Sequence, residues 1–203
     1  SDARLLLVDR HAAPGGHWND AYPFVRLHQP SATYGVNSMP LGEGWRELDG
    51  MNQGASERAS GPELLAYFER VMRRLRASGR VTYLPLHEAR QDPQGQWTLH
   101  SLLDRRQQGP VVVHRRVVDT RYIGTEVPST RPPRYTVAQG VTCIPPNALP
   151  QPRAVPPGYV VIGAGKTGVD ACLWLLENGV SPERIRWVRP REAWFHNRRF
   201  IEC

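Results

Sequence analysis

The sequence predicts an α/β fold, because short apolar runs that suit parallel strands alternate with a helical pattern. Residues 5–8 (Leu-Leu-Leu-Val) are typical of a buried parallel strand. Residues 159–162 (Tyr-Val-Val-Ile) form a second such run, which is followed by a glycine-rich turn, an amphipathic segment and a return strand over 185–188. A strand, a helix and a second strand in this order indicate a parallel strand pair joined by a crossover helix.

The composition is that of an ordinary soluble globular protein. The chain has 203 residues, of which 40% are hydrophobic and 22% charged, enough for one large domain or two small ones. No apolar run approaches the roughly 18 residues of a membrane span. Cys143, Cys172 and Cys203 are far apart and form no CxxC, which argues against a disulfide framework and a zinc site. We therefore expect a cytoplasmic protein with no metal and no membrane span.

The charge balance is basic, with a formal net charge of +7. Such a balance is compatible with nucleic acid, an anionic membrane or a phosphate-bearing ligand. The arginines are scattered and are not interleaved with aromatic residues as they are in single-strand binders. We expect a small-molecule ligand rather than nucleic acid.

The first strand is followed by a break at Pro14-Gly15-Gly16 and then by a long segment without a sustained period. Residues 17–47 are rich in proline, glycine, asparagine and aromatic side chains, and we predict an ordered loop there. A loop of this length in a compact domain usually has a function or wraps a ligand.

A helix is predicted to begin at residues 60–63 (Ser-Gly-Pro-Glu) and to end at Gly79. Three strands are expected after it, over residues 80–86, 96–102 and 111–118, with a polar turn at 104–109. They would form a small antiparallel meander. The prolines between Pro128 and Pro157 predict an irregular connector.

Residues 163–168 (Gly-Ala-Gly-Lys-Thr-Gly) match the pattern G-x-G-x-x-G between a strand and a helix. In such a turn Gly163 permits the tight bend, Gly165 lets the backbone approach a pyrophosphate, and Gly168 allows close helix packing. Lys166 and Thr167 stand in the same turn, where the helix N-terminus faces the phosphates. One alternative is a tight turn that binds nothing; an ATPase P-loop is excluded, because that motif needs glycine where Val160 stands.

The nature of the dinucleotide is indicated at the end of the second strand. NAD-binding versions carry an acidic residue about 20 residues further on, which holds the ribose 2′-hydroxyl. This chain has Arg189 and Arg191 there, and the first carboxylate is Glu192. A guanidinium suits a 2′-phosphate and cannot accept from a hydroxyl, so NADP(H) is favoured over NAD(H). The alternative is that both arginines are simply solvated.

A second group of residues surrounds the first predicted strand. Asp9 ends that strand, where its carboxylate could accept hydrogen bonds from the ribose hydroxyls of an adenosine. Gly15-Gly16-His17-Trp18 follows, and the order strand, acid, G-G-x-W resembles the flavin domain of flavin-containing and Baeyer–Villiger monooxygenases. The resemblance extends to a set of short matches in the following segment and to the later glycine turn, which stands where the NADPH domain of those families begins. The short matches are Tyr22-Pro23, Arg26-Leu27, Pro30-Ser31 and Tyr34.

The resemblance implies an NADPH-dependent, FAD-linked oxidoreductase. By it, Asp9 and Arg10 would bind the FAD adenosine, and Gly16, His17 and Trp18 would line the flavin nucleotide. His17, His28 and Asn37 share the long loop and could approach the flavin ring, or the loop could only satisfy its own backbone. In those families NADPH reduces the flavin, which then activates dioxygen to oxygenate a soft nucleophile or a ketone.

The resemblance also implies two Rossmann-like (three-layer ββα) dinucleotide-binding domains, both incomplete. Residues 1–127 would be a partial FAD domain with the β-meander, 128–157 the connector, and 158–203 the start of the NADP(H) domain. The family's first glycine loop would precede Leu5, its F-x-G-x-x-x-H signature is absent, and His28 stands at an expected aspartate. A complementing chain segment or a second copy of the chain would complete the sheet. The alternative to the oxidoreductase is a non-catalytic NADP(H)-binding module or a degenerate flavoprotein that has lost the FAD phosphate loop. No catalytic residue is assigned.

Overall fold

The computed structural model describes residues 3–49, 52–121, 127–151, 154–197 and 200. The chain divides into two compact units. The first unit comprises Ser1–Asp20 and Leu64–Glu126, and the second comprises Ala21–Glu63 and Val127–Cys203. Among the described residues the architecture is mixed α/β, with two α-helices and four small sheets. The α/β class predicted from the sequence is therefore confirmed at this level.

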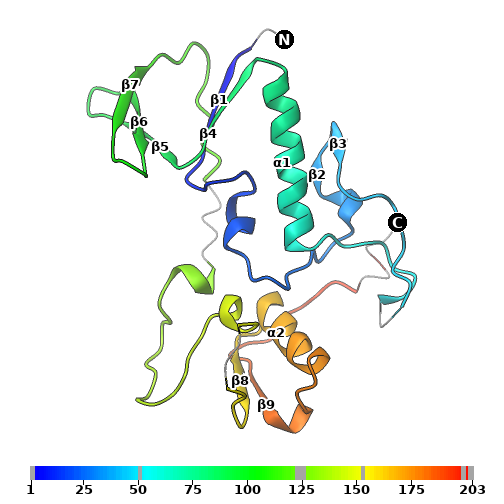
Figure 1. The fold of residues 1–203 in the computed structure, drawn as a ribbon. Coiled ribbons are helices and arrows are strands. Elements are labelled where there is room, and N and C mark those ends of the chain that lie inside the picture. Colours follow the sequence, from blue (N-terminus) through cyan, green and yellow to red (C-terminus); the bar gives the residue numbers. More distant parts are fainter. Residues whose placement is uncertain (1–2, 50–51, 122–126, 152–153, 198–199, 201–203) are drawn as a thin grey trace. The chain divides into compact units, whose positions relative to one another are not determined.

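The first unit contains a parallel strand pair. β1 (Leu5–Val8) lies beside β4 (Val81–Leu84), with Leu5 opposite Val81 and Val8 opposite Leu84 (Figure 1). The predicted strand at 5–8 and its parallel pairing are confirmed. Its complete burial is wrong, because Leu5 and Leu6 are exposed in a sheet of only two described strands.

Helix α1 (Gly61–Ala77) confirms the predicted helix and its signals. The backbone N–H of Ser60 donates to Glu63 Oε2 at 2.7 Å, and the N–H of Glu63 lies 3.4 Å from Ser60 Oγ. This reciprocal pair is a capping box. At the other end Gly79 adopts φ +68° and donates its N–H to the Arg76 carbonyl, which ends the helix.

The antiparallel meander is present, but two of its three strands differ from the prediction. It consists of β5 (His87–Gln91), β6 (Trp97–Ser101) and β7 (Gln107–Val111) in that order. The prediction of a strand over residues 96–102 is confirmed by β6. The prediction that residues 80–86 and 111–118 are its partner strands is wrong, because β6 pairs with β5 and β7. Leu86 at φ +53° separates β4 from β5, so that β4 pairs with β1 instead.

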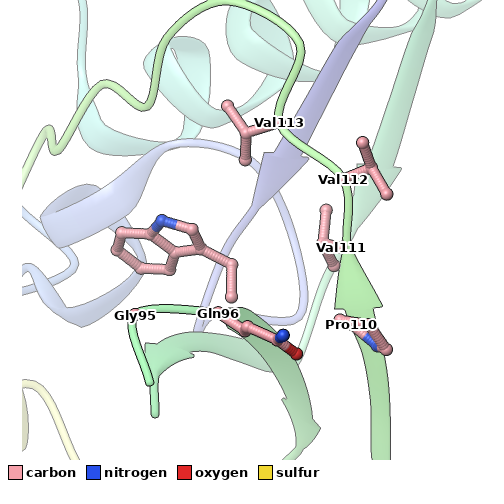
Figure 2. A pocket seen from close by; sticks show the side chains of 7 residues that line it. Gly95, Gln96, Pro110, Val111, Val112 and Val113 are labelled. Carbon is pink, nitrogen blue, oxygen red and sulfur yellow. The ribbon is translucent and has the colours of Figure 1, made fainter. Parts of the chain in front are cut away.

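The third strand begins early because the chain reverses early. Arg105 adopts φ +59°, and Gln107 is already paired with His100. The predicted turn at 104–109 therefore ends sooner than expected. A shallow hollow of about 290 Å³ beside β7 is lined by none of the residues predicted to bind a cofactor (Figure 2). Its lining consists of Gly95, Gln96, Trp97, Pro110, Val111, Val112 and Val113.

In the second unit the segment after Asp20 is an ordered loop, as predicted, with one small hairpin that was not expected. The hairpin pairs β2 (Gly35–Val36) with β3 (Met39–Pro40). Leu27 and Ser31 are buried, and the backbone N–H of Leu27 donates to the Ala59 carbonyl at 2.9 Å. In return, the N–H of Ala59 donates to Ser31 Oγ at 2.8 Å. These two buried hydrogen bonds, one to a backbone carbonyl and one to a side-chain hydroxyl, hold the loop without regular secondary structure.

The second unit also contains the predicted strand–turn–helix–strand unit. β8 (Tyr159–Ile162) is parallel to β9 (Ile185–Val188), and α2 (Lys166–Glu177) connects them (Figure 1). Ala171 and Leu175 are buried on one side of α2. Gly179 at φ +80° follows the helix, as expected from Asn178-Gly179.

The described residues of the proline-rich connector contain only short 3-10 turns at Pro128–Thr130 and Pro146–Ala148. No α-helix in the described part of the chain has the length and apolar character that a membrane crossing requires.

Candidate functional site

The glycine turn (residues 163–168) lies between the end of β8 and the first turn of α2. Gly163 adopts φ +131°, a conformation that residues with a side chain rarely adopt, and its N–H donates to the Val188 carbonyl at 2.9 Å. A Cβ on Gly168 would lie 2.4 Å from the carbonyl oxygen of Gly163. Two of the three glycines are therefore required by the chain's own geometry.

Gly165 is different. Its backbone is extended (φ −77°, ψ 177°), and a Cβ built on it would meet none of the described atoms within 4 Å. Neither the conformation nor the packing of the described residues explains a glycine there. Open space over the backbone is what the close approach of a ligand requires.

The open backbone at Gly165 coincides with the N-terminus of α2. Gly165 caps the helix with its backbone alone, since the described residues supply no side-chain cap. The N–H groups of Gly168 and Val169 point back to the Gly165 carbonyl at 3.0 and 3.2 Å. The unpaired N–H groups of a first helical turn and the positive end of the helix dipole favour an anion.

Lys166 and Thr167 lie in this first turn of α2, as the sequence predicts. The ammonium of Lys166 pairs with the Asp170 carboxylate one turn further on, and the Lys166 side chain stays partly exposed. The hydroxyl of Tyr22 donates to the same Asp170 oxygen at 2.6 Å. Burial of the phenol raises the pKa of Tyr22, and the hydrogen bond to the Asp170 anion raises it further.

The contact between Tyr22 and Asp170 belongs to a wider packing of the long loop on α2. Tyr22 is only 8% exposed, and the ring of Phe24 stacks on Trp174 with centroids 5.5 Å apart. Sequence reasoning missed this contact. The available signals were the Tyr22-Pro23 match and the spacing of Asp170 four residues after Lys166.

The residues predicted to select the cofactor lie at the end of β9. The guanidinium carbon of Arg189 lies 5.2 Å from the centroid of the Trp187 ring, and the Trp187 indole N–H donates to the Gly163 carbonyl at 2.7 Å. The Arg189 side chain is 49% exposed, with Glu192 Oε2 3.9 Å from its Nη1. Arg191 is exposed. Trp187, which the sequence did not single out, thus connects Arg189 to the glycine turn.

In the first unit Asp9 follows β1 and is already engaged. Its Oδ1 accepts from the His11 backbone N–H at 2.9 Å and lies 3.2 Å from the His11 ring, while Tyr83 donates to Oδ2 at 3.1 Å. A carboxylate offers about four acceptor positions. Three of them are filled by these groups, so Asp9 has room for one ribose hydroxyl rather than both.

His11 also binds Asp20, with Nε2 2.8 Å from Asp20 Oδ2. Partial burial lowers the pKa of His11, but the hydrogen bonds to Asp20 and Asp9 outweigh it and leave the pKa raised. His11 therefore ties the end of β1 to the 3-10 helix Gly16–Asp20. The sequence had not indicated this residue.

Of the residues near Asp9, Gly16 leaves open space beside its backbone, whereas Gly15 and Arg10 already contact other side chains. Gly16, at φ +54°, would meet none of the described atoms if it carried a Cβ, whereas a Cβ on Gly15 would lie 2.7 Å from Leu65. Gly15 therefore has a packing reason, and Gly16 leaves open space. Arg10 pairs with Glu88 at 3.0 Å on the surface.

His17 and Trp18 lie side by side with ring centroids 5.1 Å apart. Burial lowers the pKa of His17 despite the opposing charge of Asp20. His28 and Asn37 lie in the second unit, where the His28 ring is 5.9 Å from that of Phe195 and Asn37 is exposed between β2 and β3. Within the described residues no cluster of His, Cys, Asp and Glu could hold a metal ion.

The chain is similar to uncharacterized proteins of Mycobacterium tuberculosis and Mycobacterium bovis. It is 47% identical to them over 203 residues, which is 100% of this chain and 36% of each relative. The chain thus spans little more than a third of the length of these curated relatives. No protein-family model matches the chain, and no solved structure matches it.

Proposed function

We propose that β8, α2 and β9 are the start of a Rossmann-like domain that binds NADP(H), in an FAD-linked oxidoreductase resembling flavin monooxygenases. The observation that carries the proposal is the difference between Gly165 and Gly168. Gly168 is excluded from carrying a side chain by the Gly163 carbonyl, whereas Gly165 faces open space at a helix N-terminus. This arrangement fits the pyrophosphate of a dinucleotide.

NADP(H) is favoured over NAD(H) by the charge at the end of β9. Arg189 and Arg191 follow β9, the position from which dinucleotide-binding domains recognise the adenosine ribose, and both side chains are exposed. Lys166 adds a cation in the first turn of α2, although Asp170 neutralises part of its charge. NADPH bound there would supply a hydride to the flavin.

The FAD part of the proposal is supported by the first unit. Asp9 ends β1 with one acceptor position open, and Gly16 leaves room over the backbone of the following turn. His17 and Trp18 stand next to that turn and would line the flavin nucleotide. We also propose a cytoplasmic location, a small-molecule substrate, and completion of the two domains by further chain or a second copy.

A specific observation favours a second candidate, a non-catalytic NADP(H)-binding module. Three groups already occupy most of the Asp9 carboxylate. They are the Tyr83 hydroxyl, the backbone N–H of His11 and the His11 ring nitrogen Nδ1. A chain that no longer binds FAD would be free to make such internal bonds. Both candidate functions require NADP(H) to bind at the glycine turn, but the oxidoreductase also requires bound FAD and the non-catalytic module does not.

The visible absorbance of the purified protein distinguishes them. A yellow protein with the absorbance band of oxidised flavin supports the oxidoreductase, and a colourless protein that binds NADPH supports the second candidate. Failure to bind either NADPH or NADH in a fluorescence titration would overturn both.

The choice of cofactor is tested by Arg189→Asp. Charge-assisted hydrogen bonds contribute about 1.5–3 kcal/mol, so we expect NADPH affinity to fall about tenfold or more and NADH affinity to change little. Arg134→Asp is the control, because Arg134 is an exposed arginine of the connector in the same unit. Equal losses for both nucleotides would contradict the assignment of Arg189.

A further inference from the structure

Trp187 makes two contacts that differ in kind, one through its nitrogen and one through its ring. The indole N–H donates to the Gly163 carbonyl at 2.7 Å, at the start of the glycine turn. The ring lies under the guanidinium of Arg189, 5.2 Å from its carbon to the centroid. A Cβ on Gly168 would come within 3.5 Å of the same indole nitrogen, so the ring edge also borders the start of α2.

We propose that Trp187 is a positioning residue that sets the preference for a 2′-phosphorylated dinucleotide by holding Arg189 in place. This inference rests on the proposed NADP(H) function of the glycine turn. Trp187 need not touch the cofactor, since it acts through Arg189 and Gly163.

The physical argument concerns the freedom of a long side chain. An exposed arginine loses rotamer entropy when it binds a phosphate, and a guanidinium that rests over an aromatic ring has lost part of that freedom already. A guanidinium has five N–H donors, and a contact with a ring face does not use them as hydrogen-bond donors to oxygen, so they can still bind phosphate oxygens. Glu192 Oε2 lies 3.9 Å from Arg189 Nη1, too far for a strong hydrogen bond that would compete with a phosphate.

The two contacts predict different effects on the two cofactors. The Gly163 carbonyl shapes the turn that receives the pyrophosphate, which NADPH and NADH share. The Arg189 guanidinium would bind the 2′-phosphate, which NADPH carries and NADH lacks. Loss of the N–H bond should therefore weaken both cofactors alike, and loss of the ring should weaken NADPH more.

Two substitutions separate these contacts. Trp187→Phe keeps an aromatic face and removes the N–H, and we expect both affinities to fall by a similar factor with an unchanged NADPH-to-NADH ratio. Trp187→Leu removes the face as well, and we expect the ratio to fall about two- to fivefold, as for an exposed cation–π contact. Trp194→Leu is the control, because Trp194 is 96% exposed and should leave the ratio unchanged.

A double-mutant cycle tests the connection to Arg189 directly. Arg189→Ala should lower the ratio less in the Trp187→Leu protein than in the wild type, by the same two- to fivefold factor. If Arg189→Ala has the same effect in both backgrounds, or if Trp187→Leu leaves the ratio intact, the inference is overturned. A wild-type protein that binds neither nucleotide would instead overturn the proposed function.

A second measurement does not require the leucine variant to fold. Adenosine 2′,5′-bisphosphate carries the 2′-phosphate without the nicotinamide, and its binding should change the tryptophan fluorescence of the wild type as the guanidinium over the Trp187 ring engages it. That change should disappear in Trp187→Phe and persist in Trp194→Phe. A change that survives in Trp187→Phe would come from another tryptophan, and would contradict engagement of the phosphate by the guanidinium over the Trp187 ring.

Discussion

The hydroxyl of Tyr22 donates a 2.6 Å hydrogen bond to Asp170, a residue 148 positions further along the chain. The Asp170 oxygen that accepts it also pairs with the ammonium of Lys166. One carboxylate thus joins the long loop to the first turn of α2. That turn is the one that we propose holds the pyrophosphate.

Removing the Tyr22 hydroxyl should destabilise the second unit and weaken nucleotide binding without changing cofactor preference. Tyr22→Phe keeps the buried ring and deletes one hydrogen bond to an anion, which costs about 1.5–3 kcal/mol in the free energy of unfolding. Urea unfolding measures this cost, and NADPH and NADH titrations should show equal losses. Tyr159→Phe, the same change in β8, should stay within about 0.5 kcal/mol. Similar costs for the two variants would contradict a special role for Tyr22.

Alanine substitutions at Gly168 and Gly165 should affect stability differently, although both should weaken nucleotide binding. Gly168→Ala places a Cβ against the Gly163 carbonyl, so we expect a loss of about 1–3 kcal/mol in stability as well as a loss of binding. Gly165→Ala meets open space in an allowed conformation, so stability should change by less than about 0.5 kcal/mol while nucleotide affinity falls. Thermal unfolding and nucleotide titration of both variants distinguish the cases. A Gly165→Ala protein with unchanged affinity would show that no ligand approaches there.

The parts of the fold that the sequence predicted well are those where local signals agree with one another. β8, α2 and β9 each have an apolar pattern and a short connection, and β8 and α2 also have glycines at their boundaries, so their bounds follow from neighbouring residues. The capping box at Ser60 and Glu63 is equally local. The strands of the meander were misplaced because Leu86 and Arg105 take positive φ, which non-glycine residues rarely adopt and which no pattern indicates.

The candidate site shows the same division. The positions of Gly163, Gly165 and Gly168 follow from the motif, and their geometry agrees with its mechanics. The pairing of Tyr22 with Asp170 depends on how a loop without a period folds back on α2, which the sequence pattern does not specify. The cofactor roles of all the predicted site residues, those of the glycine turn and of Asp9, Arg10, His28 and Asn37 alike, remain predictions that nucleotide binding has to test.

The bridge from His11 to Asp9 and Asp20 should make stability depend on pH. The folded-state pKa of His11 is raised, so the stabilisation is fully present below the unfolded pKa of about 6.5 and is lost as the pH rises through the folded pKa. We expect the stability difference between wild type and His11→Gln to be about 1 kcal/mol at acidic pH and to shrink above neutrality. Urea unfolding between about pH 5 and 8 measures it, within the range in which histidine titrates.

His114→Gln provides the control for that series, because His114 is exposed. His17 has a lowered pKa and contributes the opposite slope, most of which is common to the wild type and both variants, because the charge of His11 is only the smallest cause of that lowering. A difference between wild type and His11→Gln that grows with pH would contradict the bridge.

Two adjacent leucines of α2 should respond very differently to truncation. Leu175 is 1% exposed and Leu176 is 42% exposed. Leu175→Ala removes fully buried methyl groups and should cost about 2–5 kcal/mol, whereas Leu176→Ala should cost well under half of that. Denaturant unfolding of both variants measures the difference. Equal costs would mean that the buried side of α2 has been assigned wrongly.

The steric relation between Gly168 and the Gly163 carbonyl has a consequence for how such a chain would diverge over time. A lineage that lost the nucleotide binding that we propose would still need glycine at position 168, since the Gly163 carbonyl forbids a side chain there. At position 165 the described residues leave room for a side chain, so that position would accept substitutions. Under the proposal, the residue found at position 165 in a descendant therefore indicates whether the nucleotide is still bound, and the glycine at 168 does not.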